Sequence, residues 1–270
     1  MSAALVLRLR AAGCVFAEEE AALILAQAGD AAEVDRLATA RESGLPLEQV
    51  LGWAALGGVR VTLAPGVFVP RRRTELMVTT AADLTAAVPA GRGPLVLLDL
   101  CCGSGAVAAA VGLALGAAGV AVEVTAADLD PVAVRCAAGN LPGARVLVSD
   151  LFDQLPEDLR GRVDMLTANV PYVPTAALAL MPREAREHEP PLALDGGDDG
   201  LAVLRRVAAD APAWLAPGGT LLMETSERQV PDALTALADA GLTPDVRTDD
   251  DLGAVVVLGT RRRSGTGPRR

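Results

Sequence analysis

The sequence predicts an α/β protein, built on a doubly wound, mostly parallel sheet of seven strands with a small helical domain before it. From about residue 94 onward, short apolar segments alternate with helix-like segments. The first apolar segment, residues 95–100, holds one charged residue, Asp99, as is typical of a strand buried on both faces of a parallel sheet. Residues 1 to about 50 differ, because their apolar stripes are spaced for helices and separated by glycines.

The expected elements of the α/β part follow in order. We expect strands at residues 95–100, 122–127, 145–149, 163–168, 220–224, near 246 and at 255–258. We expect helices after Gly105, from Pro131, over roughly 200–215 and over about 231–240, with a turn at residues 217–219. Proline suits the start of the second helix, because the first helical turn tolerates it.

Four parts are expected along the chain. Residues 1–51 form an N-terminal helical domain, and residues 52–70 form a linking β-hairpin whose strands flank a turn at Pro65 and Gly66. Residues 71–260 form the α/β domain. Residues 261–270, which hold five arginines and no apolar anchor, form a disordered basic tail.

Charge and composition exclude several classes of protein. With 34 acidic against 24 basic residues, the net charge of −10 argues against a protein whose whole surface binds nucleic acid. No apolar run has the length of a membrane span and no secretion signal is evident, so we expect a cytoplasmic protein with reduced thiols. The four cysteines form no C-x-x-C pair and His188 is the single histidine, so no metal site is expected.

A glycine-rich loop between the first strand and its helix is the first candidate binding site. Its residues are Cys101, Cys102, Gly103, Ser104 and Gly105. Glycine lets the backbone approach a ligand closely, and the helix N-terminus offers free N–H groups. Asp128 lies where an acid that binds ribose is expected. The pattern fits either a pyrophosphate dinucleotide or an adenosine that carries another group.

Asp99 helps to separate these two ligands. A carboxylate beside the loop repels a pyrophosphate but attracts the ammonium and sulfonium of S-adenosylmethionine, whose ribose hydroxyls Asp128 would bind. After the third strand, Asp150 could accept from the adenine amine, and Leu151 and Phe152 could sandwich its ring. An ordinary core contact for Leu151 or Phe152 is the alternative.

The segment that follows the fourth strand is the candidate catalytic site. Asn169, Val170, Pro171 and Tyr172 come where ligands bind in open α/β sheets. The Asn169 side-chain oxygen and the Val170 carbonyl could each accept one N–H of a planar NH₂ group, and the Tyr172 ring could cover it. In the alternative, Asn169 caps a turn and Tyr172 packs in the core.

These segments together resemble the protein-(glutamine-N5) methyltransferases that modify peptide chain release factors, which are class I adenosylmethionine-dependent methyltransferases with a Rossmann-like sheet. The matching segments are residues 45–52, 65–71 with Thr74 and Glu75, 99–105, Asp128, 150–152, 169–172, Glu189 and Pro190 with Ala193 and Leu194, and 215–219. The resemblance implies methyl transfer from S-adenosylmethionine to the side-chain amide of a glutamine, typically in a release factor, and a small N-terminal helical domain.

Three positions depart from the family pattern. Val170 replaces the first proline of Asn-Pro-Pro-Tyr, Cys101 stands where the family usually has glycine, and Pro-Arg-Pro-Glu-Thr-Glu becomes PRRRTE over residues 70–75. His188 stands where the family commonly has an aromatic residue, and we expect it at a pocket wall or on the surface. The change over residues 70–75 bears on the identity of the substrate more than on the chemistry.

Three other functions remain open. A methyltransferase that acts on an exocyclic amine of a nucleic-acid base shares a similar pocket, although the acidic charge and the lack of a basic stripe weigh against it. A nicotinamide-dependent oxidoreductase would explain the glycine loop but neither Asp99 nor the segment from Asn169 to Tyr172. A catalytically weak binding paralogue is compatible with the changes at Val170 and Cys101. No membrane partner and no direct nucleic-acid partner are expected.

Overall fold

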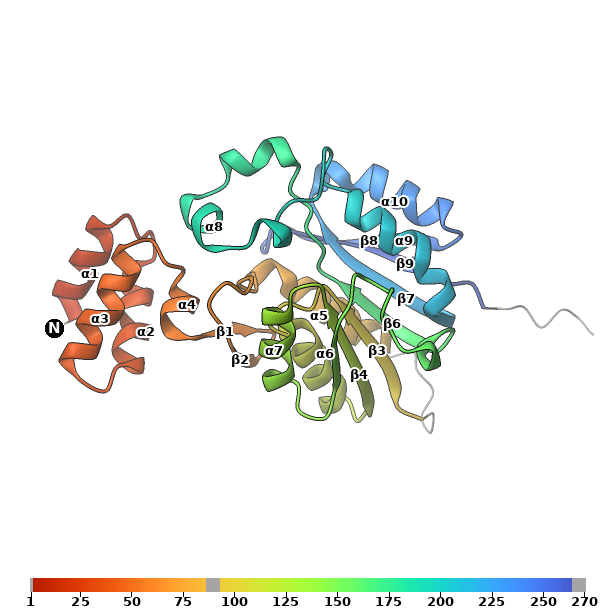
Figure 1. Cartoon of the computed structure of the whole chain (residues 1–270), viewed down its shortest axis with the longest axis horizontal. Helices are drawn as coiled ribbons and strands as arrows, with labels where there is room; N and C mark the ends of the chain where they lie inside the picture. The colour runs from red at the N-terminus through yellow and green to blue at the C-terminus, as the bar shows by residue number, and fades with distance from the viewer. Residues whose placement is uncertain (1, 86–92, 264–270) are drawn as a thin grey trace, which may run out of the picture.

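A computed structural model describes residues 2–85 and 93–263 (Figure 1). In this part of the chain a seven-stranded sheet has the strand order β5-β4-β3-β6-β7-β9-β8. The strands are β3 (Leu95–Leu100), β4 (Val122–Asp128), β5 (Arg145–Val148), β6 (Val163–Ala168), β7 (Leu215–Thr225), β8 (Thr243–Asp249) and β9 (Ala254–Thr260). In this described sheet β9 runs opposite to the other six strands. The predicted fold class is therefore confirmed.

The sheet is buried on both faces by helices. Along β3, Leu95 and Leu97 belong to a core cluster on one face, and Val96, Leu98 and Leu100 belong to the cluster on the other. This alternation follows from the two-residue period of a strand. Because every position of β3 but one is apolar, the strand packs against a hydrophobic core on each face. The helices α5 (Glu75–Thr85), α6 (Ala106–Ala117) and α7 (Pro131–Asn140) cover the first face, and α9 (Ala202–Trp214) and α10 (Val230–Asp239) cover the second.

Strand order reverses at the middle of the sheet. The chain builds outward from β3 through β4 to β5, returns to the other side of β3 as β6, and continues to β7. The loops after β3 and β6 therefore leave the same sheet edge side by side, and a crevice opens between them. This reversal puts the glycine loop beside the segment that begins at Asn169.

The β-hairpin lies earlier than expected. Its strands are β1 (Trp53–Leu56) and β2 (Val59–Thr62), joined at Gly57 and Gly58 and not at Pro65 and Gly66. Both linking glycines have positive φ, as a tight hairpin turn requires. The alternation after Thr62 resembled a strand, but residues 63–71 form none, and Pro65 and Pro70 have no N–H to donate to a ladder.

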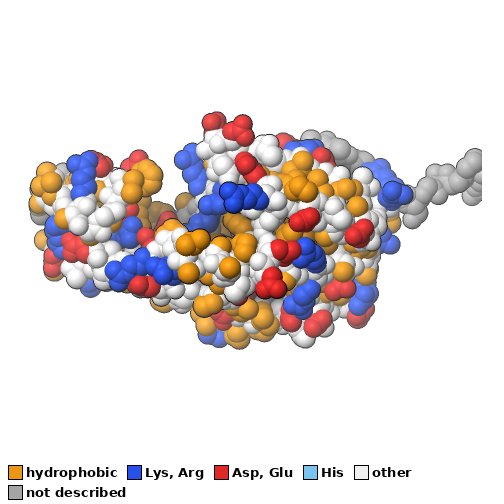
Figure 2. Space-filling view, turned by 90° about the horizontal axis from the view of Figure 1, so that it is seen from above, with side chains coloured by type: hydrophobic (Ala, Val, Ile, Leu, Met, Phe, Trp, Pro, Cys, Tyr) orange, Lys and Arg blue, Asp and Glu red, His pale blue; other side chains and the backbone are white. Residues whose placement is uncertain are grey.

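Four N-terminal helices pack around a small core of their own. They are α1 (Ser2–Ala11), α2 (Ala17–Gln27), α3 (Ala31–Glu42) and α4 (Leu47–Leu51), and their buried side chains include Leu9, Ile24 and Leu37. Figure 2 shows these helices as a lobe on the left, with a hollow between it and the rest of the molecule. An ion pair spans the two parts, because Arg41 of α3 reaches Glu184 of α8 (Arg183–His188) at 3.2 Å.

Two details near the end of the chain differ from expectation. Residues 217–219 form no separate turn, because β7 runs through them with an irregularity in its pairing to β6. Arg261 is not part of a free tail: its backbone N–H donates to Gly219 and its carbonyl accepts from Gly218, each at 2.9 Å, which extends the pairing of β9. Residues 264–270 of the expected tail lie outside the described residues. No helix in the described ranges is both long and apolar enough to cross a bilayer.

Candidate active site

A cleft opens at the carboxyl ends of β3, β4, β5 and β6, where the sequence placed the ligand site. Nine of the expected site residues line it: Cys101, Cys102, Gly103, Ser104, Asp128, Asp150, Leu151, Asn169 and Pro171. The cleft is not lined by the other expected residues, which are Asp99, Gly105, Phe152, Val170 and Tyr172. The cleft therefore brings the glycine loop, the acid after β4 and the segment after β6 into one site.

The glycine loop turns sharply before α6. Gly105, the residue before α6, has a φ of +78°, and a Cβ there would lie 2.9 Å from Leu141 of the neighbouring loop. At Gly103, with a φ of +54°, no atom lies within 4 Å of the position of a Cβ. The first residue of the loop, Cys101, has a φ of 53°, which is costly for a residue with a side chain. A glycine at this position, as in the resembling family, would adopt that φ without strain.

Asp99 lies buried behind the loop. Its Oδ1 accepts a hydrogen bond from the Thr167 hydroxyl of β6 at 2.7 Å, while its Oδ2 is buried with no hydrogen-bond partner among the described residues. Burial raises the pKa of Asp99 to about 7. The Thr167 hydroxyl and the Ala108 backbone N–H oppose that rise. A cationic or N–H-bearing ligand close by would favour the ionised form further.

Asp128 and Asp130 make different hydrogen bonds. Asp128 accepts from the N–H groups of Gly103 and Asp130, at 2.8 and 2.9 Å, and lines the cleft. Burial raises the pKa of its carboxyl, and the two N–H groups oppose that change. Asp130 instead caps α7, because its side chain accepts from the Val132 N–H at 2.8 Å. Both acids line the cleft, and Asp130 differs from Asp128 in that one of its oxygens is held by the cap of a helix.

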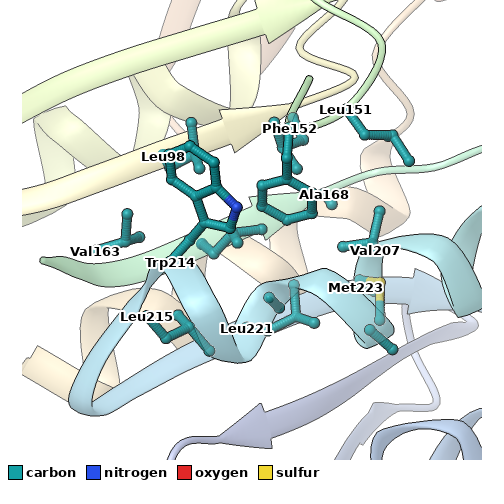
Figure 3. Close-up of a cluster of buried hydrophobic side chains, with 14 of the residues drawn as sticks. Leu98, Leu151, Phe152, Val163, Ala168, Val207, Trp214, Leu215, Leu221 and Met223 are labelled. Carbon is teal, nitrogen blue, oxygen red and sulfur yellow. The ribbon is translucent and has the colours of Figure 1, made fainter. Parts of the chain in front are cut away.

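The segment after β5 divides between cleft and core. Leu151 and Phe152 belong to the same buried cluster (Figure 3). Leu151 also lines the cleft, with a φ of 51°, whereas Phe152 stacks on Trp214 with ring centroids 5.6 Å apart. The core alternative therefore holds for Phe152. Asp150 shares the cleft wall with Arg206 of α9, whose guanidinium lies 2.9 Å from its Oδ1. No local pattern in the sequence points to this arginine.

Beyond β6, a chain of hydrogen bonds links three elements. The Asn169 amide nitrogen donates to the Thr74 hydroxyl at 3.4 Å, and Thr74 donates to Glu224 at 2.7 Å. The other Glu224 oxygen accepts from the Tyr172 hydroxyl at 2.8 Å. Tyr172 is thus tied to β7 and does not line the cleft, and Val170 is buried in the sheet core.

Sequence reasoning did not assign Thr74 and Glu224 to the site. Thr74 directly precedes α5 and lines the cleft, and Glu224 is 1% exposed. A signal existed for Glu224, because it is a carboxylate near the end of an apolar strand, as Asp99 is in β3. His188, expected at a pocket wall or the surface, is half-buried beside the N-terminal helices: its carbonyl accepts from Gln49 of α4, and it does not line the cleft.

Comparison with known proteins gives the family. No family model matches the chain. A 4-amino-L-phenylalanine/4-methylamino-L-phenylalanine methyltransferase from Streptomyces pristinaespiralis is 39% identical over 68% of this chain, and the match spans 62% of that protein, less than two thirds of its length. A release factor glutamine methyltransferase from Deinococcus radiodurans is 38% identical, over 77% of this chain and 72% of the relative. The chain belongs to the release factor glutamine methyltransferase family.

The fold agrees with this family. A methyltransferase structure from Pyrococcus furiosus superposes with a TM-score of 0.51 at 14% identity, over 75% of this chain and 89% of that one. That likeness concerns the sheet and its helices. The protein is therefore an adenosylmethionine-dependent methyltransferase of class I, as the sequence predicted.

The methyl donor of this family member is S-adenosylmethionine, which supplies a methyl group already activated by a sulfonium charge. Two observations fit it, one at Asp99, which does not itself line the cleft, and one at the glycine loop, which does. The buried Asp99 Oδ2 lacks a donor, and the ammonium of this cofactor could supply one. The backbone at Gly103 leaves open the space that a Cβ would fill. We expect Asp99 and the glycine loop to hold the methionine part, and Asp128 the ribose.

Proposed function

We propose that this methyltransferase modifies the side-chain amide nitrogen, N5, of a glutamine in a protein, and that the protein is a peptide chain release factor. The observation that carries the proposal is the Asn169 amide, which lines the cleft beside the glycine loop with its nitrogen already engaged by Thr74. The relatives named release factor glutamine methyltransferases support the same substrate. Such a substrate would place the enzyme in the cytoplasm.

The reaction depends mainly on how the acceptor nitrogen is positioned. An amide nitrogen is a weak nucleophile, because its lone pair is delocalised into the carbonyl. Asn169 Oδ1 would accept one N–H of the substrate amide and the Val170 carbonyl the other, so that the nitrogen faces the cofactor in line. The same acceptors would stabilise the positive charge that develops on nitrogen as the bond forms. An N-protonated amide loses its proton readily, so the site needs no strong base.

A second candidate substrate is a free aromatic amine. The Streptomyces relative is named for 4-amino-L-phenylalanine, and an aryl amine presents a flat NH₂ group to the same acceptors. The shape of the cleft would decide whether such a free amine binds. The nucleic-acid base and nicotinamide alternatives lack such a relative among those reported above.

The proposal is tested by offering the purified enzyme S-adenosylmethionine with a release factor, with 4-amino-L-phenylalanine, or with double-stranded DNA. Mass spectrometry of the release factor peptides is expected to show one added methyl group on a glutamine and none in the other two reactions. Methylation of the free amino acid alone would replace the protein substrate by a small molecule. No product in any reaction, with cofactor binding intact, would favour a binding paralogue.

A further inference from the structure

The carboxylate of Glu224 accepts hydrogen bonds from two hydroxyl groups. Its Oε1 accepts from Tyr172 at 2.8 Å and its Oε2 accepts from Thr74 at 2.7 Å, and the residue is 1% exposed. An ionised carboxylate can only accept, so both hydroxyl groups must point their hydrogens at it. Glu224 of β7 thus joins the residue before α5 to the segment after β6 at one buried point.

Two opposing influences act on the charge of Glu224, and burial is the larger of them. Burial raises the pKa of its carboxyl, while the Thr74 and Tyr172 hydroxyls and the guanidinium groups of Arg73 and Arg71 lower it. Within residues 2–85 and 93–263, Glu224 is the buried carboxylate that accepts from both hydroxyls. The ionised form satisfies both oxygens at once, whereas a protonated carboxyl would have to donate to one hydroxyl and turn its hydrogen away.

The hydrogen bond from Thr74 to Glu224 also determines how the Asn169 amide is oriented. A threonine hydroxyl has one hydrogen, and in Thr74 this hydrogen is donated to Glu224. The Thr74 oxygen can therefore only accept a hydrogen bond from its next neighbour. The group that faces it at 3.4 Å must therefore be the NH₂ end of the Asn169 amide. Because the two ends of an amide point in different directions, Oδ1 is left available on the side away from Thr74.

We propose that Thr74, held by Glu224, is a positioning residue that keeps the oxygen of the Asn169 amide turned toward the acceptor nitrogen. This inference rests on the proposed function, in which Asn169 accepts an N–H from the substrate amide. A reversed Asn169 amide would present its own NH₂ to the substrate NH₂, two donors facing each other, and the reacting nitrogen would lose its orientation.

A spectroscopic test is possible because the chain contains only two asparagines, Asn140 and Asn169. Selective ¹⁵N labelling of asparagine side chains therefore gives two NH₂ groups. The Asn140 amide donates to the carbonyls of Thr62 and Ser104, at 2.8 and 2.9 Å, and serves as an internal reference. Loss of one signal in Asn169→Ala assigns the other.

The informative pair of variants is Thr74→Val, which keeps the shape without the hydroxyl, and Thr74→Ser, which keeps the hydroxyl. We expect Thr74→Val to shift the Asn169 NH₂ resonances and to speed their exchange with water, with Asn140 unchanged. Its kcat is expected to fall by about tenfold or more, with the affinity for S-adenosylmethionine unchanged. Thr74→Ser should keep both the resonances and the kcat near those of the parent.

The outcomes separate the two proposals. If Thr74→Val and Thr74→Ser behave alike in both measurements, whether both are active or both impaired, the hydroxyl does not position Asn169 and the inference is overturned. In that case a large loss of activity in Asn169→Ala still supports the proposed function. If Asn169→Ala is as active as the parent, the proposed function itself fails. The variant Thr79→Val, at an exposed threonine in the helix that follows Thr74, controls for the substitution and should change neither measurement.

Discussion

The carboxylate of Asp128 accepts a hydrogen bond from the backbone N–H of Gly103 at 2.8 Å, and so ties the end of β4 to the loop after β3. This bond holds the proposed ribose acid and the glycine loop in one fixed arrangement. Each oxygen of Asp128 accepts from one backbone N–H, which leaves further lone pairs available at the cleft. Ribose recognition and the shape of the loop are thus coupled through one residue.

The first prediction compares Asp128→Ala with Asp130→Ala by calorimetric titration. Asp128→Ala should weaken S-adenosylmethionine binding by one to two orders of magnitude, since a hydrogen bond to a charged acceptor contributes about 1.5–3 kcal/mol. Asp130→Ala should lower the free energy of unfolding by about 1 kcal/mol through the lost cap of α7, with affinity near that of the parent. Unchanged affinity in Asp128→Ala would remove it from the ribose role.

A second prediction concerns the backbone at Cys101, whose φ is 53°. Cys101→Gly should be more stable than Cys101→Ala by about 1 kcal/mol, because both variants lose the sulfur and only glycine adopts this φ without strain. Chemical denaturation of the two variants gives the difference directly. If Cys101→Ala proves equally stable or more stable, the conformation at this residue carries no strain.

The third prediction separates core from cleft after β5. Phe152 is 6% exposed and stacks on Trp214, whereas Leu151 lines the cleft. Phe152→Ala should lower the free energy of unfolding by about 3–5 kcal/mol, and the milder Phe152→Leu should leave S-adenosylmethionine affinity unchanged. A marked loss of affinity in a folded Phe152→Leu protein would show that its ring contacts the adenine after all.

A fourth prediction is a pH dependence. Burial raises the pKa of Asp99 to about 7 in the folded protein, while the unfolded chain titrates near its ordinary value of 3.8. Between these values the folded state holds the extra proton, so the free energy of unfolding should fall as pH rises from about 4 to about 7, by up to about 1.4 kcal/mol per pH unit. Above about pH 7 this contribution is constant.

The variant Asp99→Asn isolates that contribution, because asparagine has a similar shape and does not titrate. Denaturation of parent and variant without cofactor, at a series of pH values, should give a difference in stability that grows in the variant's favour up to about pH 7. A difference that stays flat across this range would mean that Asp99 titrates alike in the folded and unfolded chain.

Much of the α/β part could be predicted from the sequence because its signals are local. The apolar run at residues 95–100 and the proline at residue 131 fix a strand and a helix start without reference to the rest of the chain. The N-terminal helices were harder to orient. Ile24 and Leu37 are buried, but Leu23 is 38% exposed beside them, and no local signal distinguishes these positions.

The hairpin was misplaced for a local reason, whereas the missed contacts of the site depend on distant residues. The hairpin turn was placed at Pro65 and Gly66, although two adjacent glycines, Gly57 and Gly58, offered the stronger signal. Thr74 and Glu224 are 150 positions apart, so their hydrogen bond leaves no periodic trace in the sequence. The same holds for the stacking of Phe152 on Trp214, which the sequence left undecided.

The central claim is that Asn169 orients the amide nitrogen that receives the methyl group. The measurement that tests it most directly is the rate of methyl transfer to the release factor glutamine by Asn169→Ala, together with its affinity for S-adenosylmethionine. We predict that the affinity stays near that of the parent while the rate falls by about 10²–10³. A parent rate in a folded Asn169→Ala enzyme would contradict the claim and move the active site elsewhere in the cleft.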